Sequence, residues 1–295
     1  MPHTEIRSAQ AEDRDTILAF CINTWEWGDY IERVWDDWLH DPEGRLFIAT
    51  VDTRPVGISH IHMLSSTEVW LEGMRVDPEY QHMGLAIALN RAMLLEGMRR
   101  GATVARLMIE ANNTRAIELA ERGHMRRVGA FAPYTAPPLA TTSQKRSMQE
   151  KPQMATIDDM DEIIDYLNAS SIFPAVGGLY YAGWAASSIT TELLEARIAD
   201  QGVYLLRRWD RLDGLAIAEQ REEYIGKCLS LGYIDGTAIE AISLIAYDLR
   251  CRLPELGLET VRAYAPDLVL VRDVLSGIEY EQNGSVYYTY ERSLV

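Results

Sequence analysis

The stretch that decides the fold is VDPEYQHMGLAIALNRAMLL, residues 76–95. It continues the strand-like segment VWLEGMRV and leads through a polar turn into a helix whose apolar residues fall on one stripe. A helix that starts directly after a strand leaves several backbone N–H groups without partners, and its dipole adds positive charge there. Gly84 has no Cβ, so an anion can approach the main chain at this turn. The stretch therefore predicts a phosphate-binding turn.

Alternating and helical apolar periods on both sides of this stretch define the first part of the chain. They predict a strand, two helices, a three-strand antiparallel meander, a helix, a strand, a helix and a last strand. In chain order these elements are expected at 5–9, from about 12, 29–39, 45–51, 56–64, 69–76, 85–99, 103–111, 114–122 and 127–131.

A Pro-, Thr-, Ser- and Gln-rich segment at 133–152 reads as a linker, and it divides the chain into residues 1–132 and 153–295. The second part repeats the element order of the first, with GVYLLRRW, GLAIAEQ and CLSLGYID as its meander. We therefore expect an α/β (α+β) fold: a mixed, mostly antiparallel sheet flanked by helices, in two tandem copies.

Composition excludes several classes of protein. With 47% hydrophobic and 24% charged residues the chain is typical of a soluble globular protein, and a net charge of -16 argues against nucleic acid as a partner. No apolar run is long enough to span a membrane and no signal architecture is visible, so we expect a cytoplasmic protein. Three widely spaced cysteines indicate neither disulfides nor a zinc ribbon. The sequence leaves the oligomeric state open, a homodimer included.

Two motifs carry a resemblance to a known family. Gln81-x-x-Gly84-x-Ala86, at the end of a strand and the start of an amphipathic helix, resembles the pyrophosphate-binding signature of the GNAT superfamily of acyl-CoA-dependent N-acyltransferases. Asn113-x-x-Ala116-x-x-Leu119 resembles the segment that follows the fifth strand in these enzymes and lines the pantetheine arm. The patterns of a P-loop and of a dinucleotide-binding fold are both missing from the sequence.

The resemblance implies that acetyl-CoA binds between the fourth and fifth strands and that a primary amine of a small molecule or peptide attacks its thioester directly. Backbone groups of Met74 and Val76 would pair with the pantetheine, and an amide near Met74 would polarise the thioester carbonyl. The positions that correspond to the coenzyme site are Met74, Val76, Gln81, His82, Met83, Gly84, Leu85, Ala86, Asn113 and Ala116.

Attack requires a deprotonated amine and hence a general base. Glu72 and Glu110 lie on the two strands that would border the cleft, and Glu72 shares a strand face with Trp70. If the hairpin closes at 65–67, His60 or His62 lies beside Glu72, which would give a proton relay. Glu72 could instead be an ordinary solvated strand residue. A metal site at the two histidines would lack a third ligand.

An aromatic and acidic segment, NTWEWGDYI at 23–31, lies between the first two helices, where the family varies with its acceptor. Trp25, Trp27 and Tyr30, together with Trp70, are the expected substrate contacts for a cationic amine, although the hydrophobic core could equally claim the tryptophans.

The sequence departs from the family at Ala120, where many members have a tyrosine that protonates the leaving thiolate. The second part also lacks both motifs, so it is expected to be a degenerate copy that supports the first. A non-catalytic acyl-CoA-binding module is the alternative function.

Overall fold

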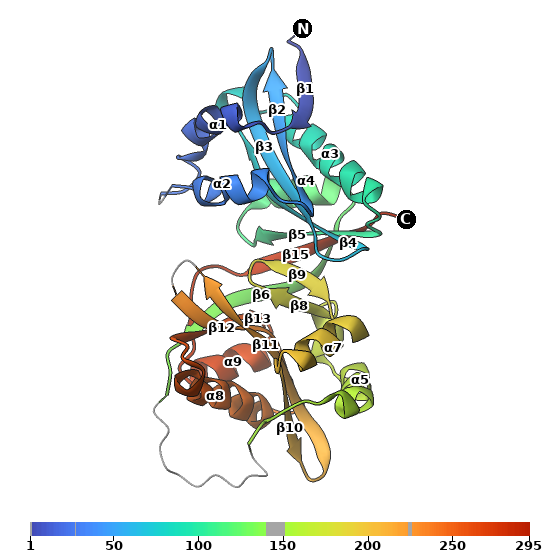
Figure 1. Cartoon of the computed structure of the whole chain (residues 1–295), viewed down its shortest axis with the longest axis vertical. Helices are drawn as coiled ribbons and strands as arrows, with labels where there is room; N and C mark the ends of the chain where they lie inside the picture. The colour runs from blue at the N-terminus through green and yellow to red at the C-terminus, as the bar shows by residue number, and fades with distance from the viewer. Residues whose placement is uncertain (1, 27, 140–150, 224–225) are drawn as a thin grey trace. The chain divides into compact units, whose positions relative to one another are not determined.

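The computed structural model describes residues 2–26, 28–139, 151–223 and 226–295, and it contains two compact units (Figure 1). The first unit consists of Met1–Met108, Thr114–Arg126 and Tyr290–Val295, and the second of Ile109–Asn113 and Arg127–Thr289. Both units pack helices on a mixed, mostly antiparallel sheet, which confirms the expected fold class.

The first unit contains the expected elements as far as the helix at 114–122, and one strand from the end of the chain. In chain order they are β1 (Thr4–Ser8), α1 (Arg14–Cys21), α2 (Ile31–Leu39), β2 (Gly44–Val51), β3 (Arg54–Met63), β4 (Glu68–Val76), α3 (Leu85–Arg99), β5 (Val104–Glu110, through Met108), α4 (Thr114–Arg122) and the last residues of β15 (Tyr287–Ser293). The strand expected at 127–131 belongs to the second unit instead.

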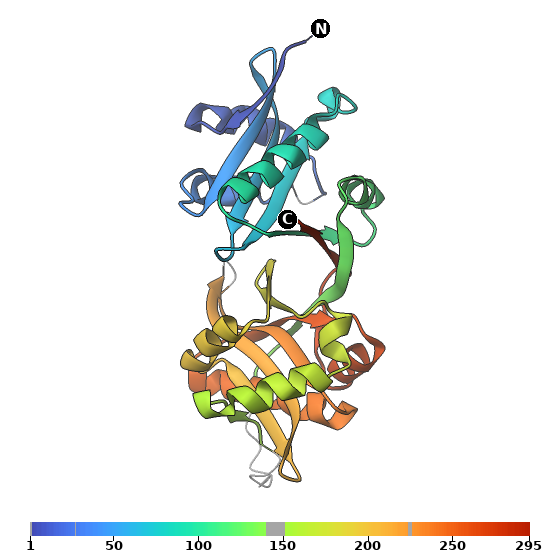
Figure 2. The ribbon, with the colours of Figure 1, turned by 90° about the vertical axis from the view of Figure 1, so that its right-hand side faces the viewer.

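Its sheet has the order β1-β2-β3-β4-β5-β15. Strands β1 to β4 are antiparallel neighbours, whereas β4 and β5 are parallel and are joined by the crossover helix α3. Helix α3 lies across one face of this sheet, and α1 and α2 cover the other face (Figures 1 and 2).

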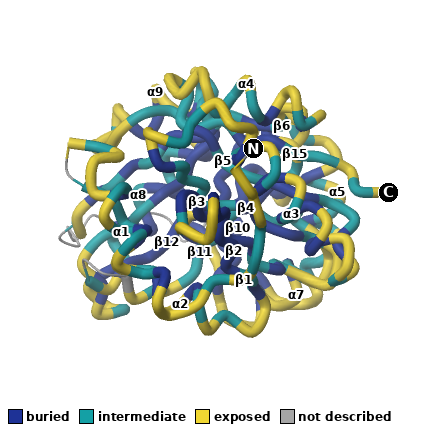
Figure 3. The backbone as a smooth tube through the Cα atoms, turned by 90° about the horizontal axis from the view of Figure 1, so that it is seen from above, coloured by how far each residue is buried: buried dark blue, intermediate teal, exposed yellow. Residues whose placement is uncertain are grey.

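The core between α1, α2 and the sheet explains why α2 forms where its sequence period predicts. Ile31, Trp35 and Trp38 recur at three- and four-residue spacing, and all three are buried. In Figure 3 buried residues follow the strands and exposed residues lie on the outer sides of the helices. The buried side chains of this cluster are Ile17, Cys21, Ile31, Trp35, Trp38, Leu46, Ile48 and Ile58.

The second unit repeats the same order, as the sequence predicts, with an additional short helix and a hairpin. Its elements are β6 (Arg126–Ala136, from Arg127), β7 (Gln153–Met154), α5 (Met160–Ala169), α6 (Ile172–Ala175), β8 (Leu179–Ala182), β9 (Ala185–Ser188), α7 (Thr191–Ala199), β10 (Val203–Arg208), β11 (Arg211–Glu223), β12 (Gly226–Gly236), α8 (Ile239–Leu256), β13 (Thr260–Pro266), α9 (Val269–Gly277), β14 (Glu281–Gln282) and the start of β15.

The sheet of the second unit has the order β6-β13-β12-β11-β10-β7, and β8 and β9 form a separate two-stranded sheet. Strand β6 extends to Ala136, so it includes the first residues of the segment expected to be linker. The rest of that segment from 140 to 150 lies outside the described residues. Across the described part of the chain, none of the helices has both the length and the apolar character that crossing a membrane requires.

Candidate active site

Strands β4 and β5 pair only at their N-terminal ends. The parallel register joins Glu68 to Val104 and ends where Trp70 meets Arg106, although β4 continues to Val76. Beyond Trp70 this edge of β4 is outside the ladder with β5, so its backbone groups can pair with an extended ligand. This edge includes Met74 and Val76, which the family resemblance predicts to contact the pantetheine.

A β-bulge redirects β4 in the same region. The pairing of β3 with β4 shifts register between Ile58 and His60, opposite Gly73, which has φ 69°. A Cβ at Gly73 would collide with the ring of Trp38. Both the backbone angle and the close approach of the tryptophan therefore require glycine at this position.

The turn before α3 is open. Gly84 has φ 79° and ψ 5° at the N-cap of α3, no side chain caps the helix, and the first turn contains no acidic residue. A Cβ built at Gly84 would meet no atom within 4 Å, and His82 also has a positive φ of 66°. Free amides of Leu85 and Ala86 at an uncapped helix N-terminus can hold an anion such as a diphosphate.

Helix α4 adds a guanidinium to this turn. Arg115 donates from Nη1 to Oε1 of Gln81 at 2.9 Å, so the side chain of Gln81 links the turn to the first turn of α4. Sequence reasoning missed Arg115, although it lies inside the Asn113-x-x-Ala116 motif. Met83 is 42% exposed beside the turn.

Glu72 and His60 form the predicted pair. His60 Nδ1 lies 2.9 Å from Glu72 Oε1, and the two residues are direct partners in the β3–β4 register. The His60 ring is 1% exposed and stacks on Trp38 with 4.6 Å between centroids. The proximity expected from the hairpin is thus confirmed, and it gives Glu72 a route for a proton.

Asp41 is a third member of this cluster that the sequence did not indicate. Its Oδ2 lies 2.7 Å from His62 Nδ1 and 3.2 Å from His60 Nε2. Asp41 comes about twenty residues before the histidines and lies outside the sequence motifs described above, so no local pattern connects it to them. Its carboxylate thus contacts both imidazoles, and His60 lies between the carboxylates of Asp41 and Glu72.

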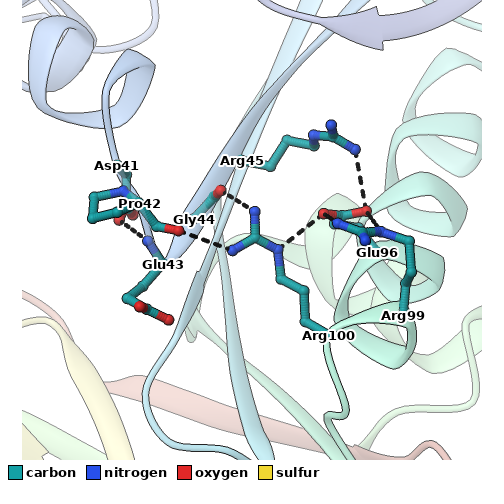
Figure 4. Close-up of polar contacts among 8 residues, drawn as sticks. All are labelled: Asp41, Pro42, Glu43, Gly44, Arg45, Glu96, Arg99 and Arg100. Atoms are coloured by element: carbon teal, nitrogen blue, oxygen red, sulfur yellow. Dashed lines mark hydrogen bonds and ion pairs between the residues drawn. The ribbon is translucent and has the colours of Figure 1, made fainter.

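Hydrogen bonds from Glu43 and Arg100 hold the loop that carries Asp41 in place (Figure 4). Glu43 N–H donates to Asp41 Oδ1 at 2.9 Å, and a Cβ at Gly44 would collide with the Asp41 carboxylate. Arg100 donates to the carbonyl oxygens of Pro42 at 3.3 Å and of Gly44 at 2.6 Å. The loop is therefore tied to the last turn of α3.

Buried Glu96 holds this arrangement together through three arginines, and we call Arg45, Glu96, Arg99 and Arg100 the Glu96 cluster. Its carboxylate accepts from Arg99 at 2.6 Å, from Arg100 at 2.9 Å and from Arg45 at 3.2 Å (Figure 4). The hydrogen bond from Arg99, supported by Arg100 and Arg45, lowers the pKa of Glu96 to about 2 against the opposing effect of burial. The charged form of Glu96 is thus the form that holds α3 to β2 and to the Asp41 loop.

A pocket of about 620 Å³ opens beside the cluster, between the end of α2 and strands β3 and β4. Trp38 and Pro42 line it together with acidic and imidazole side chains. No lysine or arginine occurs among its lining residues. The titratable groups in the lining are Asp36, Asp37, Asp41, Glu72, His40, His60 and His62.

The aromatic wall expected to bind a cationic substrate already contains a cation. Arg75 Nε donates to Asp29 Oδ2 at 2.8 Å, and its guanidinium lies 4.6 Å from the Trp25 ring centroid and 5.2 Å from that of Tyr30. These rings and this carboxylate therefore satisfy Arg75, and we correct their assignment as the cation site. Trp27 lies outside the described residues.

Three further residues expected at the site, Trp70, Glu110 and Asn113, do not line this pocket. Trp70 is 2% exposed, because it lies in the paired part of β4, so its expected substrate contact is replaced by a role in packing. Glu110 is the last residue of β5 and is grouped with the second unit, as is Asn113, and neither lines the pocket described above. In the described part of the chain no group of three or more His, Cys, Asp or Glu side chains is arranged to hold a metal ion.

Comparison with known proteins identifies the first unit. Residues 10–124 match the family model described as the Acetyltransferase (GNAT) family. This range includes the turn at Gly84, the Glu72–His60 pair and α4. No curated protein sequence matches the chain.

Solved structures share the fold of the whole chain at low sequence identity. A GCN5-related N-acetyltransferase from Sphaerobacter thermophilus is 13% identical with a TM-score of 0.57, over 99% of this chain and 96% of that one. A tandem GNAT protein from the clavulanic acid biosynthesis pathway is 11% identical with a TM-score of 0.52, over 99% of both chains. The chain is therefore similar in fold to a tandem GNAT protein through both of its units.

Proposed function

Residues 10–124 form a domain of the GNAT acetyltransferase family, and from this premise we propose that the chain is an N-acetyltransferase that uses acetyl-CoA. The acceptor is a primary amine of a small molecule or peptide, which attacks the thioester directly. We assign the acetyl-CoA site to the domain at 1–132 and a supporting role to the degenerate domain at 153–295.

The observation that carries this proposal is the empty, uncapped turn at Gly84. The pyrophosphate of coenzyme A would lie against the backbone amides from His82 to Ala86, because a Cβ at Gly84 would meet no atom within 4 Å and no side chain caps the helix. Met83 and Leu85 contribute through their main chain, and Arg115 supports the same anion through its guanidinium.

The edge of β4 that is unpaired with β5 beyond Trp70 supports a binding site for the pantetheine part of coenzyme A. The pantetheine would pair with backbone groups of Met74 and Val76 on the free edge of β4, and Ala116 on α4 of the same unit is a further proposed contact. Asn113 stays a contact expected from the sequence. The thioester supplies an activated acetyl carbonyl. An amide near Met74 would stabilise the negative charge that develops on its oxygen.

We assign Glu72 as the general base, with His60 as the group that shares its proton. The acceptor ammonium loses a proton toward Glu72, and the neutral amine then forms the new C–N bond as the C–S bond breaks. The nitrogen releases its second proton to water as the amide forms. The leaving thiolate takes up a proton from water, since Ala120 stands where many family members have a tyrosine. Glu110 stays a second candidate base from the sequence.

Turnover tests the proposal on the full chain. We expect acetyl-CoA to bind in calorimetry and a panel of primary amines to cause thiol release, with the acetylated amine identified by mass spectrometry. The position of Ala120 favours one alternative, a non-catalytic acyl-CoA-binding module. Binding of acetyl-CoA with no thiol release from any amine would support that alternative and contradict the proposed transfer.

A further inference from the structure

The pocket beside Glu72 has the charge of a cation-binding site. Its lining holds four carboxylates and no lysine or arginine. Asp36 and Asp37 lie at its exposed rim, whereas Asp41 and Glu72 are partly buried inside it. Closely spaced carboxylates in a concave surface attract positively charged ligands.

His60 provides an independent sign that a hydrogen-bond donor belongs in this pocket. Its ring is 1% exposed, and Nε2 makes no hydrogen bond to any described residue, although Asp41 Oδ2 lies 3.2 Å away. A neutral imidazole has a single N–H. When Nδ1 donates to Glu72, Nε2 turns a lone pair toward the carboxylate of Asp41, so two acceptors face the same space.

An ammonium group satisfies both acceptors. It has three N–H donors, no acceptor and a positive charge, so it can donate to His60 Nε2 and to Asp41 while a third N–H points toward the acidic rim. A neutral hydroxyl has only one donor, and an anion would meet four carboxylates. The chemistry of the pocket therefore selects an alkylammonium.

We propose that the acetyl acceptor is a diamine or polyamine, an inference that rests on the acetyl transfer proposed above. One ammonium of the acceptor binds beside His60 and Asp41 under the rim of Asp36 and Asp37. A second amine, carried on the same alkyl chain, lies on the opposite edge of the His60 ring, where Glu72 removes its proton. The other cation-binding surface suggested by the sequence, around Trp25 and Tyr30, is filled by Arg75.

The test compares putrescine with n-butylamine, which has the same chain and reacting amine but no second nitrogen. Calorimetry with the full chain measures binding of each compound, and thiol release with acetyl-CoA measures transfer. We expect putrescine to bind about tenfold more tightly than n-butylamine and to have a correspondingly lower KM.

Variants locate the effect in the pocket. The double change Asp36→Asn with Asp37→Asn removes rim charge at exposed positions, and we expect it to lower kcat/KM for putrescine about fivefold without changing kcat/KM for n-butylamine, whose single amine must lie at Glu72 to react. Asp41→Asn removes the carboxylate next to Nε2 and should weaken putrescine binding further. Asp15→Asn, whose side chain is 96% exposed on α1, removes the same charge elsewhere and should leave both affinities unchanged.

The outcomes separate this inference from the proposed function. Equal affinities and equal thiol release for putrescine and n-butylamine would overturn the diamine assignment and leave acetyl transfer standing. Putrescine binding that depends on Asp41 and the rim, without thiol release, would uphold the ammonium site and overturn acetyl transfer. Unchanged putrescine binding in both pocket variants would overturn the site itself.

Discussion

The two units differ at the equivalent turn from strand to helix, which is open in the first unit and filled in the second. In the first unit β4 leads through Gly84 into α3, and the space in front of that glycine is empty. In the second unit β12 ends at Gly236 and α8 begins at Ile239, and a Cβ at Gly236 would lie 2.7 Å from the Ile242 side chain. The turn before α8 is therefore filled by side chains and offers no anion site. Glu240 in the first turn of α8 would also repel an anion.

The same contrast extends along the strands. Gly232 is the extra residue of a bulge in β12, as Gly73 is opposite the register shift in β4, but the backbone and ring of the β8–β9 hairpin press against it. The pair at the position of Glu72 and His60 is Leu231 and Ala218, both part of the apolar core. The same arrangement of strands thus holds a polar, open site in the first unit and a filled apolar core in the second.

Removing the charge of Glu72 should have the largest effect, because it makes the first unit resemble the second at this position. We expect Glu72→Gln to lower kcat for the acceptor amine by about a hundredfold or more while acetyl-CoA affinity stays unchanged. Steady-state thiol release and calorimetry measure the two quantities. Glu32→Gln, a 71% exposed carboxylate on α2, serves as the control. A kcat that stays within twofold of the parent would exclude Glu72 as the base.

Closing the turn at Gly84 tests the contrast between the two crossovers. Gly84→Leu fills the free space and strains a left-handed backbone, so we expect a loss of coenzyme A affinity of about a hundredfold, the worth of one or two charge-assisted hydrogen bonds. Gly257, at φ 67° with nothing within 4 Å of a Cβ, is the matched position at the end of α8. Gly257→Leu should show a similar strain in thermal unfolding and no loss of affinity. Equal affinities in the two variants would contradict the phosphate cradle.

The Glu96 cluster next to the Asp41 loop predicts a pH dependence of stability. The pKa of Glu96 is about 2, below its ordinary value, so its stabilising effect is complete above about pH 4.5 and is lost as the pH falls toward 2. The charged form stabilises the fold by about 2–3 kcal/mol. Urea unfolding across this range should show the loss in the parent chain and in Glu118→Gln, a 66% exposed control, but not in Glu96→Gln. An unchanged slope in Glu96→Gln would show that other groups cause the dependence.

The sequence predicted the features that depend on local order. The period of α2, the meander and the turn at Gly84 follow from residues close together in the chain, and the register of one hairpin places His60 opposite Glu72. Asp41, Arg115 and the position of Arg75 could not be predicted, since each depends on how separate elements pack. The aromatic residues expected to bind a cationic substrate illustrate this. Trp25 and Tyr30 do contact a cation, but it is the guanidinium of Arg75, which comes from β4.

Strand β15 has a consequence for how the protein is made. Residues Tyr290–Val295 belong to the first unit, where buried Arg106 donates to Glu291 at 2.8 Å and Arg292 donates to the carbonyl of Gly123 at 2.9 Å. The sheet of the first unit is therefore incomplete until the ribosome has synthesised everything between Arg126 and Tyr290. A nascent first unit must wait, with an exposed strand edge, for a segment encoded more than a hundred and fifty codons later.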